Sequence, residues 1–393
     1  MKKILILISI LLLTGCWNYK ELNEIAIATG IAIDYKDDKY EITTLISNVQ
    51  KQEGNSKEGE AQVSAYSGKG KTITEALKEI DEKIPKKLYL KHTGVLVISE
   101  AVAKKGVMEI LDYLVRDPNS PSRFFILLSR DKDAKTVLKI LSPLESFPSE
   151  NIALMLKTTA ELQGTAIDIP YSDFLKAFLE KGKNPIMTSI TVIGDEEKGK
   201  SDKNTKESEP LAYPQISTTA IFKDDKLVDY VNQSESLGIN IINDDINKLN
   251  IQIPCEENYI VISLSKLKTK TDISKNYNVN IEIEGSGYIS EANCNIDLNS
   301  QKNIEKIETE AEQKIKKMVN QTLKTVQGHK SDVFGFGNQY YKHYSNEWEK
   351  ISEKWDDEIF PSLDFNIKTN IVLKTKGAAS KTVKEVHESN ERK

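Results

Sequence analysis

The sequence predicts an α+β protein that holds two or three folded domains behind an export signal. Its 393 residues, 39% hydrophobic and 29% charged, are enough to form more than one ordinary core. Strand-like and helix-like patterns alternate along two stretches of the chain, as in sheets flanked by helices. Residues 196–210 carry many charges and no large apolar side chain, so they separate the two stretches as a linker or a solvated loop.

Charge, hydropathy and rare residue types exclude several classes of protein. Lys and Arg together number 54 against 59 Asp and Glu, so nucleic acid is not an expected partner. A mean hydropathy of -0.43 excludes a polytopic membrane protein. Three Cys and four His are too few and too scattered for a zinc cluster, and we expect no metal and no cofactor.

The first fifteen residues are typical of an export signal. Lys2 and Lys3 precede the apolar run 4–13, which is too short to span a ~30 Å hydrocarbon core. The run ends in a bacterial lipobox pattern, which predicts cleavage between Gly15 and Cys16 and lipid attachment to Cys16; an ordinary signal peptide with an incidental Cys is the alternative. Two acyl chains hold a protein stably on a bilayer, so the mature chain is expected to be anchored outside the cytoplasm.

The patterns between residues 25 and 141 predict the first unit, of α/β or α+β type. Two β-compatible stretches, 25–33 and 40–49, should pair around a turn at Asp37 and Asp38. The elements expected after this hairpin are a helix opened by a capping box of Thr72 and Glu75 and closed by Pro85, a strand over 94–99, a helix over 107–115, a strand over 124–128, and a helix over 134–141 capped by Asp131 or Asp133.

The second unit begins after the charged run. A hairpin is expected at 218–231 with its turn at Asp224 and Asp225, and alternating residues predict half-buried strands at 260–264 and 279–283. A helix is expected over 304–326, with Gly328 as its stop. A second helical stripe, ended by Pro361, consists of Tyr341, Tyr344, Trp348, Ile351 and Trp355. A strand over 363–373 with one buried face and a disordered tail over 378–393 complete the chain.

No constellation in the chain predicts catalysis. Residues 65–72 resemble a phosphate loop at their Gly-Lys-Thr end, but Ala65 stands where that motif has Gly, and a tight turn explains the same residues. His343 and Glu347, one helical turn apart, are a metal pair or, more simply, a surface pair. Cys255 and Cys294 either form a disulfide outside the cytoplasm or remain two reduced core residues.

Arginine and tryptophan are rare and clustered. Arg116, Arg123 and Arg130 fall within fifteen residues, and we expect their planar guanidinium groups to join the helix and strand of the first unit; an anionic ligand site is the alternative. The stripe that holds Trp348 and Trp355 is interpreted as core, with a partner surface as the alternative.

Several motifs resemble one family, in order along the chain. They are Gly-Cys-Trp-Asn-Tyr-Lys-Glu-Leu at 15–22, Lys-His-Thr at 91–93, Arg-Asp-Pro at 116–118, and Ser-Asp-Val-Phe-Gly-Phe-Gly at 331–337 leading to Trp348 and Trp355. Over residues 16–377 the chain resembles the Ger(x)C spore germination lipoproteins, the C subunits of nutrient germinant receptors. The family often has Asp at position 18 and Pro at position 345, where this chain has Asn18 and Ser345; a helix starting at 345 would leave Tyr341 and Tyr344 outside it.

The resemblance implies an α+β lipoprotein of three domains, 16–195, 211–258 and 259–377, each a β-sheet flanked by helices. It implies a place on the outer face of the spore inner membrane, beside an integral A subunit and a transporter-like B subunit, with no catalysis. A solute-binding lipoprotein of a transporter is the alternative, and it would need two similar lobes. Cys16 alone transfers with a chemical role; the motif residues expected to serve structure or partner contact are Arg116, Asp332, Phe334, Gly335, Gly337, Trp348 and Trp355.

Overall fold

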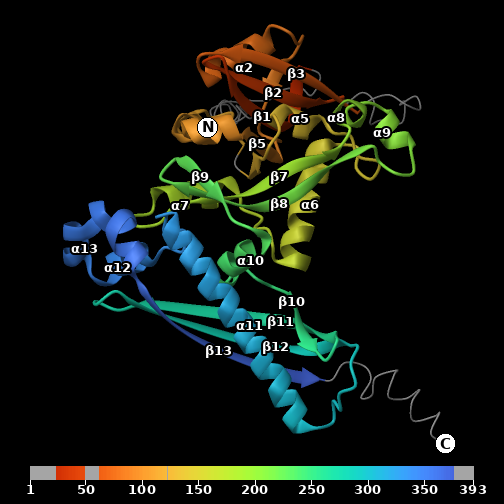
Figure 1. The fold of residues 1–393 in the computed structure, drawn as a ribbon. Coiled ribbons are helices and arrows are strands. Elements are labelled where there is room, and N and C mark those ends of the chain that lie inside the picture. Colours follow the sequence, from red (N-terminus) through yellow and green to blue (C-terminus); the bar gives the residue numbers. More distant parts are fainter. Residues whose placement is uncertain (1–23, 49–61, 122, 376–393) are drawn as a thin grey trace, which may run out of the picture.

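The computed structural model describes residues 24–48, 62–121 and 123–375, which form two mixed β-sheets with helices packed on them (Figure 1). The predicted α+β class is confirmed. The signal segment 1–15, Cys16 and the tail 378–393 lie outside the described residues. Within those three ranges no helix is long and apolar enough to cross a membrane.

The first sheet has nine strands, and the four at its centre, β1, β5, β6 and β7, run parallel to one another. The outer strands pair antiparallel with their neighbours, except β4, which pairs parallel with β1. In spatial order the strands are β3 (Val63–Gly70), β2 (Lys39–Ser47), β1 (Ile25–Lys36), β5 (Val95–Ser99), β6 (Phe125–Ser129), β7 (Ile186–Gly194), β8 (Ala212–Lys223) and β9 (Lys226–Tyr230), with β4 (Lys87–Tyr89) beside β1.

Helices cover both faces of this sheet, which is why the central strands are continuous apolar runs. In β5 every residue is buried: Leu96 and Ile98 belong to one core cluster, Val95 and Val97 to the other. The first cluster includes α2 (Ile73–Asp81), α3 (Glu100–Lys105), α4 (Met108–Arg116) and α7 (Tyr171–Leu179), and the second includes α5 (Ala134–Lys139) and α6 (Pro148–Gln163).

Both predicted hairpin turns are confirmed. Asp37 and Asp38, between β1 and β2, have φ values of 52° and 56°. Positive φ at both central residues is the type I′ geometry that matches the twist of the flanking strands. Asp224, between β8 and β9, has a φ of 52°. Short acidic residues at these positions therefore mark the turns, because Asp tolerates the left-handed region better than most residues do.

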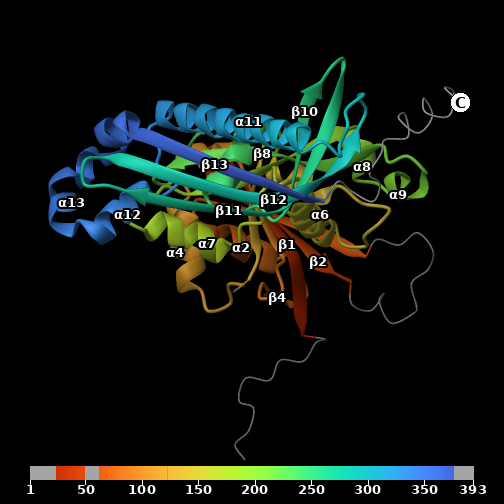
Figure 2. The ribbon, with the colours of Figure 1, turned by 90° about the horizontal axis from the view of Figure 1, so that it is seen from below.

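The second sheet has four strands, with α11 (Gln301–Gly328) running alongside them (Figures 1 and 2). The helix predicted over 304–326 buries one face against the sheet. Its residues at steps of three or four are buried, namely Ile304, Ile307, Ala311, Ile315, Thr322 and Val326, except that Met318 is only partly buried and its neighbour Val319 is buried instead. The helix ends at Gly328 as predicted, but the left-handed residue after it is Lys330, with a φ of 54°. The strands are β10 (Leu249–Cys255), β11 (Asn258–Ile273), β12 (Asn278–Ala292) and β13 (Asp364–Thr375), the last parallel to β12.

The segment between the two predicted units belongs to the first sheet. β7 and β8 are antiparallel neighbours, so the charged run 196–210 is a loop between paired strands; it carries the short helices α8 (Glu196–Gly199) and α9 (Lys203–Lys206). Buried Asn204 holds this loop by bonding the backbone of Leu141 and Ala212. β8 and β9 extend the first sheet, so the described residues form two sheets and not the expected three.

Two further features join the parts of the fold. Helix α10 (Gln233–Ile242) lies between the sheets and contacts both β8 and β11 (Figure 1). Cys255, at the end of β10, and Cys294, after β12, form a disulfide with their Cα atoms 5.9 Å apart. This bridge closes the four-stranded sheet at the end where β10, β11 and β12 meet.

Candidate functional site

The loop 331–337, whose motif is part of the family resemblance, is organised by one carboxylate. Asp332 is completely buried between α11 and α12 (Phe336–His343). Its carboxylate accepts five N–H groups: Oδ1 binds the backbone of Phe334, Gly335 and Phe336 at 3.2, 2.8 and 3.2 Å, and Oδ2 binds the backbone of Gly337 at 2.7 Å and Trp355 Nε1 at 3.0 Å. Burial raises the pKa of Asp332 to about 6, against the opposing effect of these donors.

Two glycines make close contact at this loop. A Cβ on Gly337 would lie 2.6 Å from Trp355 Nε1 and 2.7 Å from the carbonyl oxygen of Gly182. Gly182 itself has a φ of 67°, and a Cβ there would lie 2.6 Å from the carbonyl carbon of Gly337. The loop before β7 and the loop before α12 therefore touch through bare backbone, which only glycine permits.

Asn184 and Asp356 extend the contact to the first sheet. Asn184 donates its amide to both carboxylate oxygens of Asp356, at 3.0 and 3.1 Å, and accepts the backbone N–H of Asp224 at 2.8 Å. Asp356 also accepts the backbone N–H of Asp332 at 3.1 Å. These bonds tie the β8–β9 turn and the segment before β7 to the 331–337 loop. We call this group, Gly182, Asn184, Asp332, Gly337, Trp355 and Asp356, the junction.

The predicted aromatic stripe is divided between two helices. α12 ends at His343, Tyr344 has φ -135° and ψ 56°, and α13 (Ser345–Ile351) begins at Ser345. The single helix expected from the stripe is wrong, whereas the helix start at 345 that the family pattern implied is confirmed. Trp348 and Trp355 are both buried, with ring centroids 5.3 Å apart. Both are therefore core residues, and Trp355 also belongs to the junction.

The other residues singled out by pattern lie at separate places. His343 and Glu347 fall on different helices, Glu347 pairs with Lys275, and the described ranges contain no group of three or more His, Cys, Asp or Glu suited to a metal. The N–H groups of Lys69 and Lys71 are bound by carboxylates of α2, Glu79 and Glu75, both at 2.7 Å. The phosphate-loop alternative therefore fails. Thr72 caps α2 as predicted, but the Glu75 carboxylate binds Lys71 and so completes no reciprocal box.

The three clustered arginines have different surroundings. Arg116 is 76% exposed and binds Asp112 within its own helix α4, so the expected link from helix to strand is wrong for this residue. Arg123 is also exposed. Arg130 alone connects elements: it donates to Thr218 Oγ1 in β8 at 3.2 Å and lies 4.5 Å from the centroid of the Tyr230 ring in β9.

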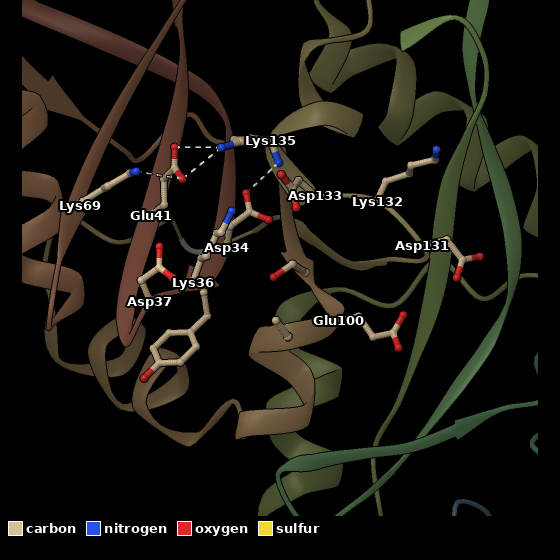
Figure 3. Close-up of a pocket in the computed structure, with 13 residues that line it drawn as sticks. Asp34, Lys36, Asp37, Glu41, Lys69, Glu100, Asp131, Lys132, Asp133 and Lys135 are labelled. Atoms are coloured by element: carbon tan, nitrogen blue, oxygen red, sulfur yellow. Dashed lines mark hydrogen bonds and ion pairs between the residues drawn. The ribbon is translucent and has the colours of Figure 1, made fainter.

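A crevice that no sequence pattern had predicted opens at the carboxyl ends of the parallel strands. α3 follows β5 onto one face of the sheet, and α5 follows β6 onto the opposite face. In open α/β sheets a crevice forms where adjacent connections leave in opposite directions, and ligands bind there. The crevice encloses about 410 Å³ and is lined by residues at the ends of β1, β5 and β6 (Figure 3).

Asp34, at the end of β1, forms the buried wall of the crevice. It is 5% exposed, and its two oxygens accept the backbone N–H groups of Ala134 at 2.7 Å and Lys135 at 3.0 Å. The cap of α5 is thus supplied by Asp34; the expected side-chain caps, Asp131 and Asp133, make no such bond. Burial raises the pKa of Asp34 to about 6.

Replacing Asp34 with Asn tests this raised pKa. An acid whose pKa rises on folding binds more protons in the folded state, so its contribution to stability is present at low pH and is lost as the pH rises through about 6. The free energy of unfolding of the wild type, relative to Asp34→Asn, should therefore fall by about 2 kcal/mol between about pH 4 and pH 7. Urea titrations of both proteins across this range measure it; a difference that is constant or rises with pH would contradict the assignment.

The remaining charges of the crevice surround Asp34. Glu41 of β2 binds Lys135 at 3.0 Å and Lys69 at 3.8 Å, and Lys132 binds Glu196 at 2.5 Å. Figure 3 shows Lys36, Asp37, Glu41 and Lys69 on one side and Asp131 and Lys132 on the other, with Asp133 drawn beside Asp34 between them. The walls are thus formed mainly by charged groups of both signs. The only sequence signal for these crevice residues is that each of the buried strands ends in a polar residue.

Two family profiles together match nearly the whole chain. The profile described as "Spore germination protein N-terminal domain" matches residues 18–192, and that described as "Spore germination B3/GerAC like, C-terminal" matches residues 217–377. The chain belongs to the Ger(x)C family of spore germination proteins. The two matches place the crevice in the N-terminal part of the Ger(x)C chain and the Asp332 loop in the C-terminal part.

Individual relatives and one solved structure support the family membership. Spore germination protein KC of Bacillus subtilis (strain 168) is 29% identical, over 97% of this chain and 97% of that protein. The putative spore germination protein YfkR of the same organism is 25% identical over 97% and 98%. The crystal structure of the GerBC protein aligns with a TM-score of 0.52 at 17% identity, covering 91% of this chain and all of that one, and so shows the Ger(x)C fold.

Proposed function

We propose that this Ger(x)C protein is the lipid-anchored C subunit of a nutrient germinant receptor, required for spores to germinate in response to nutrients. The observation that carries the proposal is the match to spore germination protein KC over 97% of both chains, which includes both sheets and the junction between them. The protein lies on the outer face of the spore inner membrane, and its partners are the integral A and B subunits.

The anchor is Cys16, attached after cleavage behind Gly15. The first described strand begins at Ile25, nine residues later, and nine residues span at most about 30 Å. A lipid on Cys16 would therefore keep the first sheet within about 30 Å of the bilayer surface. Such a short tether supports a body that works beside integral membrane partners.

The proposed role is non-catalytic. The two most buried carboxylates described here, Asp34 and Asp332, are both held by backbone N–H donors and serve the fold. The alternative of a transporter's solute-binding protein would need two similar lobes. The described sheets differ in size and strand order, with nine strands and four, so that arrangement has no support.

Deletion of the coding region tests the proposal, in a strain that carries no redundant receptor. Spores of the deletion strain should fail to germinate with nutrients, yet should still germinate with a trigger that bypasses nutrient receptors. Restoring the wild-type gene should restore the response. Full germination of the deletion spores with every nutrient tried would refute the proposed function.

Replacement of Cys16 by Ala tests the anchor. The variant should move from the membrane pellet to the soluble fraction, because a single covalent lipid site supplies the membrane affinity. Mass spectrometry of the N-terminal peptide should find Cys16 acylated in the wild type. Matched controls are Cys255→Ala and Cys294→Ala, which should stay in the pellet. An unmodified Cys16, or a Cys16→Ala protein that stays in the pellet, would contradict lipid anchoring.

A further inference from the structure

Two carboxylates meet at the junction without a counter-ion. Asp332 is completely buried and Asp356 is partly buried, and the backbone N–H of Asp332 donates to Asp356 Oδ1 at 3.1 Å. Within the described residues neither carboxylate forms an ion pair. Lys223 and Lys330 pair with the exposed carboxylate of Asp357 instead, at 2.9 and 3.7 Å. The fold thus places two acidic groups side by side in a site that excludes much of the water.

The charged groups around this pair do not remove the repulsion within it. They are Lys183 before β7, Lys223 and Asp224 at the β8–β9 turn, Lys330 after α11, and Asp357 beside Asp356. Burial disfavours each carboxylate charge, and a second carboxylate nearby disfavours it further, so such a pair retains a proton that an exposed acid would lose. Burial raises the pKa of Asp332 to about 6, and it raises the pKa of Asp356 as well.

The segment that carries Asp356 has an irregular backbone. It consists of a 3₁₀ turn over Ser352–Lys354, a π-helical turn over Trp355–Ile359 and a second 3₁₀ turn over Phe360–Ser362. π-Helical turns are rare and occur often at functional sites, and 3₁₀ stretches within helical segments often mark hinges. A segment of this kind changes its hydrogen-bonding pattern more readily than a continuous α-helix does.

Asp356 joins the two sheets through Asn184. Asn184 donates to both oxygens of Asp356, at 3.0 and 3.1 Å, and accepts the backbone N–H of Asp224 at 2.8 Å. Lys223 lies close enough to attract the ionised form of Asp356 and to oppose the rise in its pKa. If Asp356 turned toward Lys223, it would lose its bonds to Asn184. The contact between the first sheet and the 331–337 loop would then rest on fewer hydrogen bonds.

We propose that Asp332 and Asp356 make the junction a pH-dependent clasp between the two sheets. One proton held by the pair keeps Asp356 bound to Asn184. When this proton leaves to the solvent, the two carboxylates repel each other, Asp356 moves toward Lys223, and the junction loosens. This regulation goes beyond the proposed function, because it is a property of the fold whether or not the chain serves a receptor.

The clasp should open as the pH rises. In the closed form the pair binds a proton with a pKa of about 6, whereas in the open form its pKa returns to about 3.9, the usual value for Asp. The closed form therefore binds more protons and is favoured at low pH. With these two values, the equilibrium constant for opening should rise about tenfold between about pH 5 and pH 8.

Hydrogen exchange of the full-length protein, followed by mass spectrometry, tests the clasp. The amides to follow are those of 334–337, which bind the Asp332 carboxylate, and that of Asn184, which binds the Asp332 carbonyl oxygen at 2.8 Å. Rates in the wild type are divided by rates in Asp356→Asn at the same pH, so the intrinsic pH dependence of exchange cancels. The ratio should rise about tenfold from about pH 5 to pH 8. A ratio that is constant or falls would overturn the proposal.

Two controls make the test specific to the junction. Glu358→Gln removes an exposed acid from the same segment, where it pairs with Lys354, and its exchange should follow the wild type at every pH. The amides of β5, in the middle of the first sheet, report any general loosening. The same pH effect for Glu358→Gln as for Asp356→Asn, or an equal rise of the ratio in β5, would overturn the proposal.

Lys223→Gln provides a second variant should Asp356→Asn fail to fold. It removes the cation that favours the ionised form of Asp356, so the clasp should stay closed to a higher pH. At about pH 8 the 334–337 amides of this variant should therefore exchange more slowly than those of the wild type. Equal or faster exchange in Lys223→Gln would overturn the proposed movement of Asp356.

Discussion

Replacing Asp332 with Ala is expected to lower the free energy of unfolding by about 3–5 kcal/mol. The carboxylate is fully buried and accepts four backbone N–H groups and the indole of Trp355, and none of these donors has access to water. Removing the acceptor would leave the donors unpaired in the core, where each costs free energy. The 331–337 loop should lose its shape, and the junction between the two sheets should open with it.

Urea unfolding followed by tryptophan fluorescence measures this effect, because Trp355 donates directly to Asp332. Asp357→Ala is the matched control. Asp357 lies beside Asp356 in the same segment, but its carboxylate is exposed and pairs with Lys223 on the surface, so its loss should change stability little. If Asp332→Ala unfolds at the same urea concentration as Asp357→Ala, the carboxylate does not organise the loop.

Gly337→Ala is expected to destabilise the protein by about 2–3 kcal/mol, although it adds only one methyl group. The new Cβ would lie 2.6 Å from Trp355 Nε1 and 2.7 Å from the carbonyl oxygen of Gly182, and neither atom sits at the end of a flexible side chain. Backbone and indole must both move, so the Asp332–Trp355 bond should lengthen. The near-ultraviolet circular dichroism of the tryptophans should weaken in the folded state.

Gly328→Ala is the control for this substitution. Gly328 is the last residue of α11, and nothing lies within 4 Å of the position of its absent Cβ. Alanine there favours the helix and restricts the unfolded chain, so stability should rise by about 0.5–1 kcal/mol. A Gly337→Ala protein as stable as the wild type would show that the two loops do not pack as tightly as described.

Local patterns predicted the elements that depend on neighbouring residues. Asp37 and Asp38 marked the first hairpin, the apolar spacing of 304–326 marked α11, and strict alternation over 363–373 marked β13. The aromatic stripe failed because helical spacing alone does not reveal a break at Tyr344, where only the backbone angles end α12. Family motifs, which placed a helix start at Ser345, succeeded there because they carry information beyond periodicity.

Long-range pairing decided everything that makes the candidate site. Asp34 caps α5 from a hundred residues earlier in the chain, and the sequence offered the nearer Asp131 and Asp133 instead. β8 and β9 look like part of a separate unit after the charged run, yet they complete the first sheet. Neither result follows from periodicity, because hydrogen bonds between distant strands leave no local signature.

The sequence by itself therefore determined the α+β class, the hairpin turns, the longest helix and the family, since these depend on periodicity, turn residues and short motifs. Only the tertiary structure decided that Asp332 binds five donors, that bare backbone meets at Gly182 and Gly337, and that a charged crevice opens at the ends of β1, β5 and β6. The physical reason is that burial and close approach arise only when distant segments pack together.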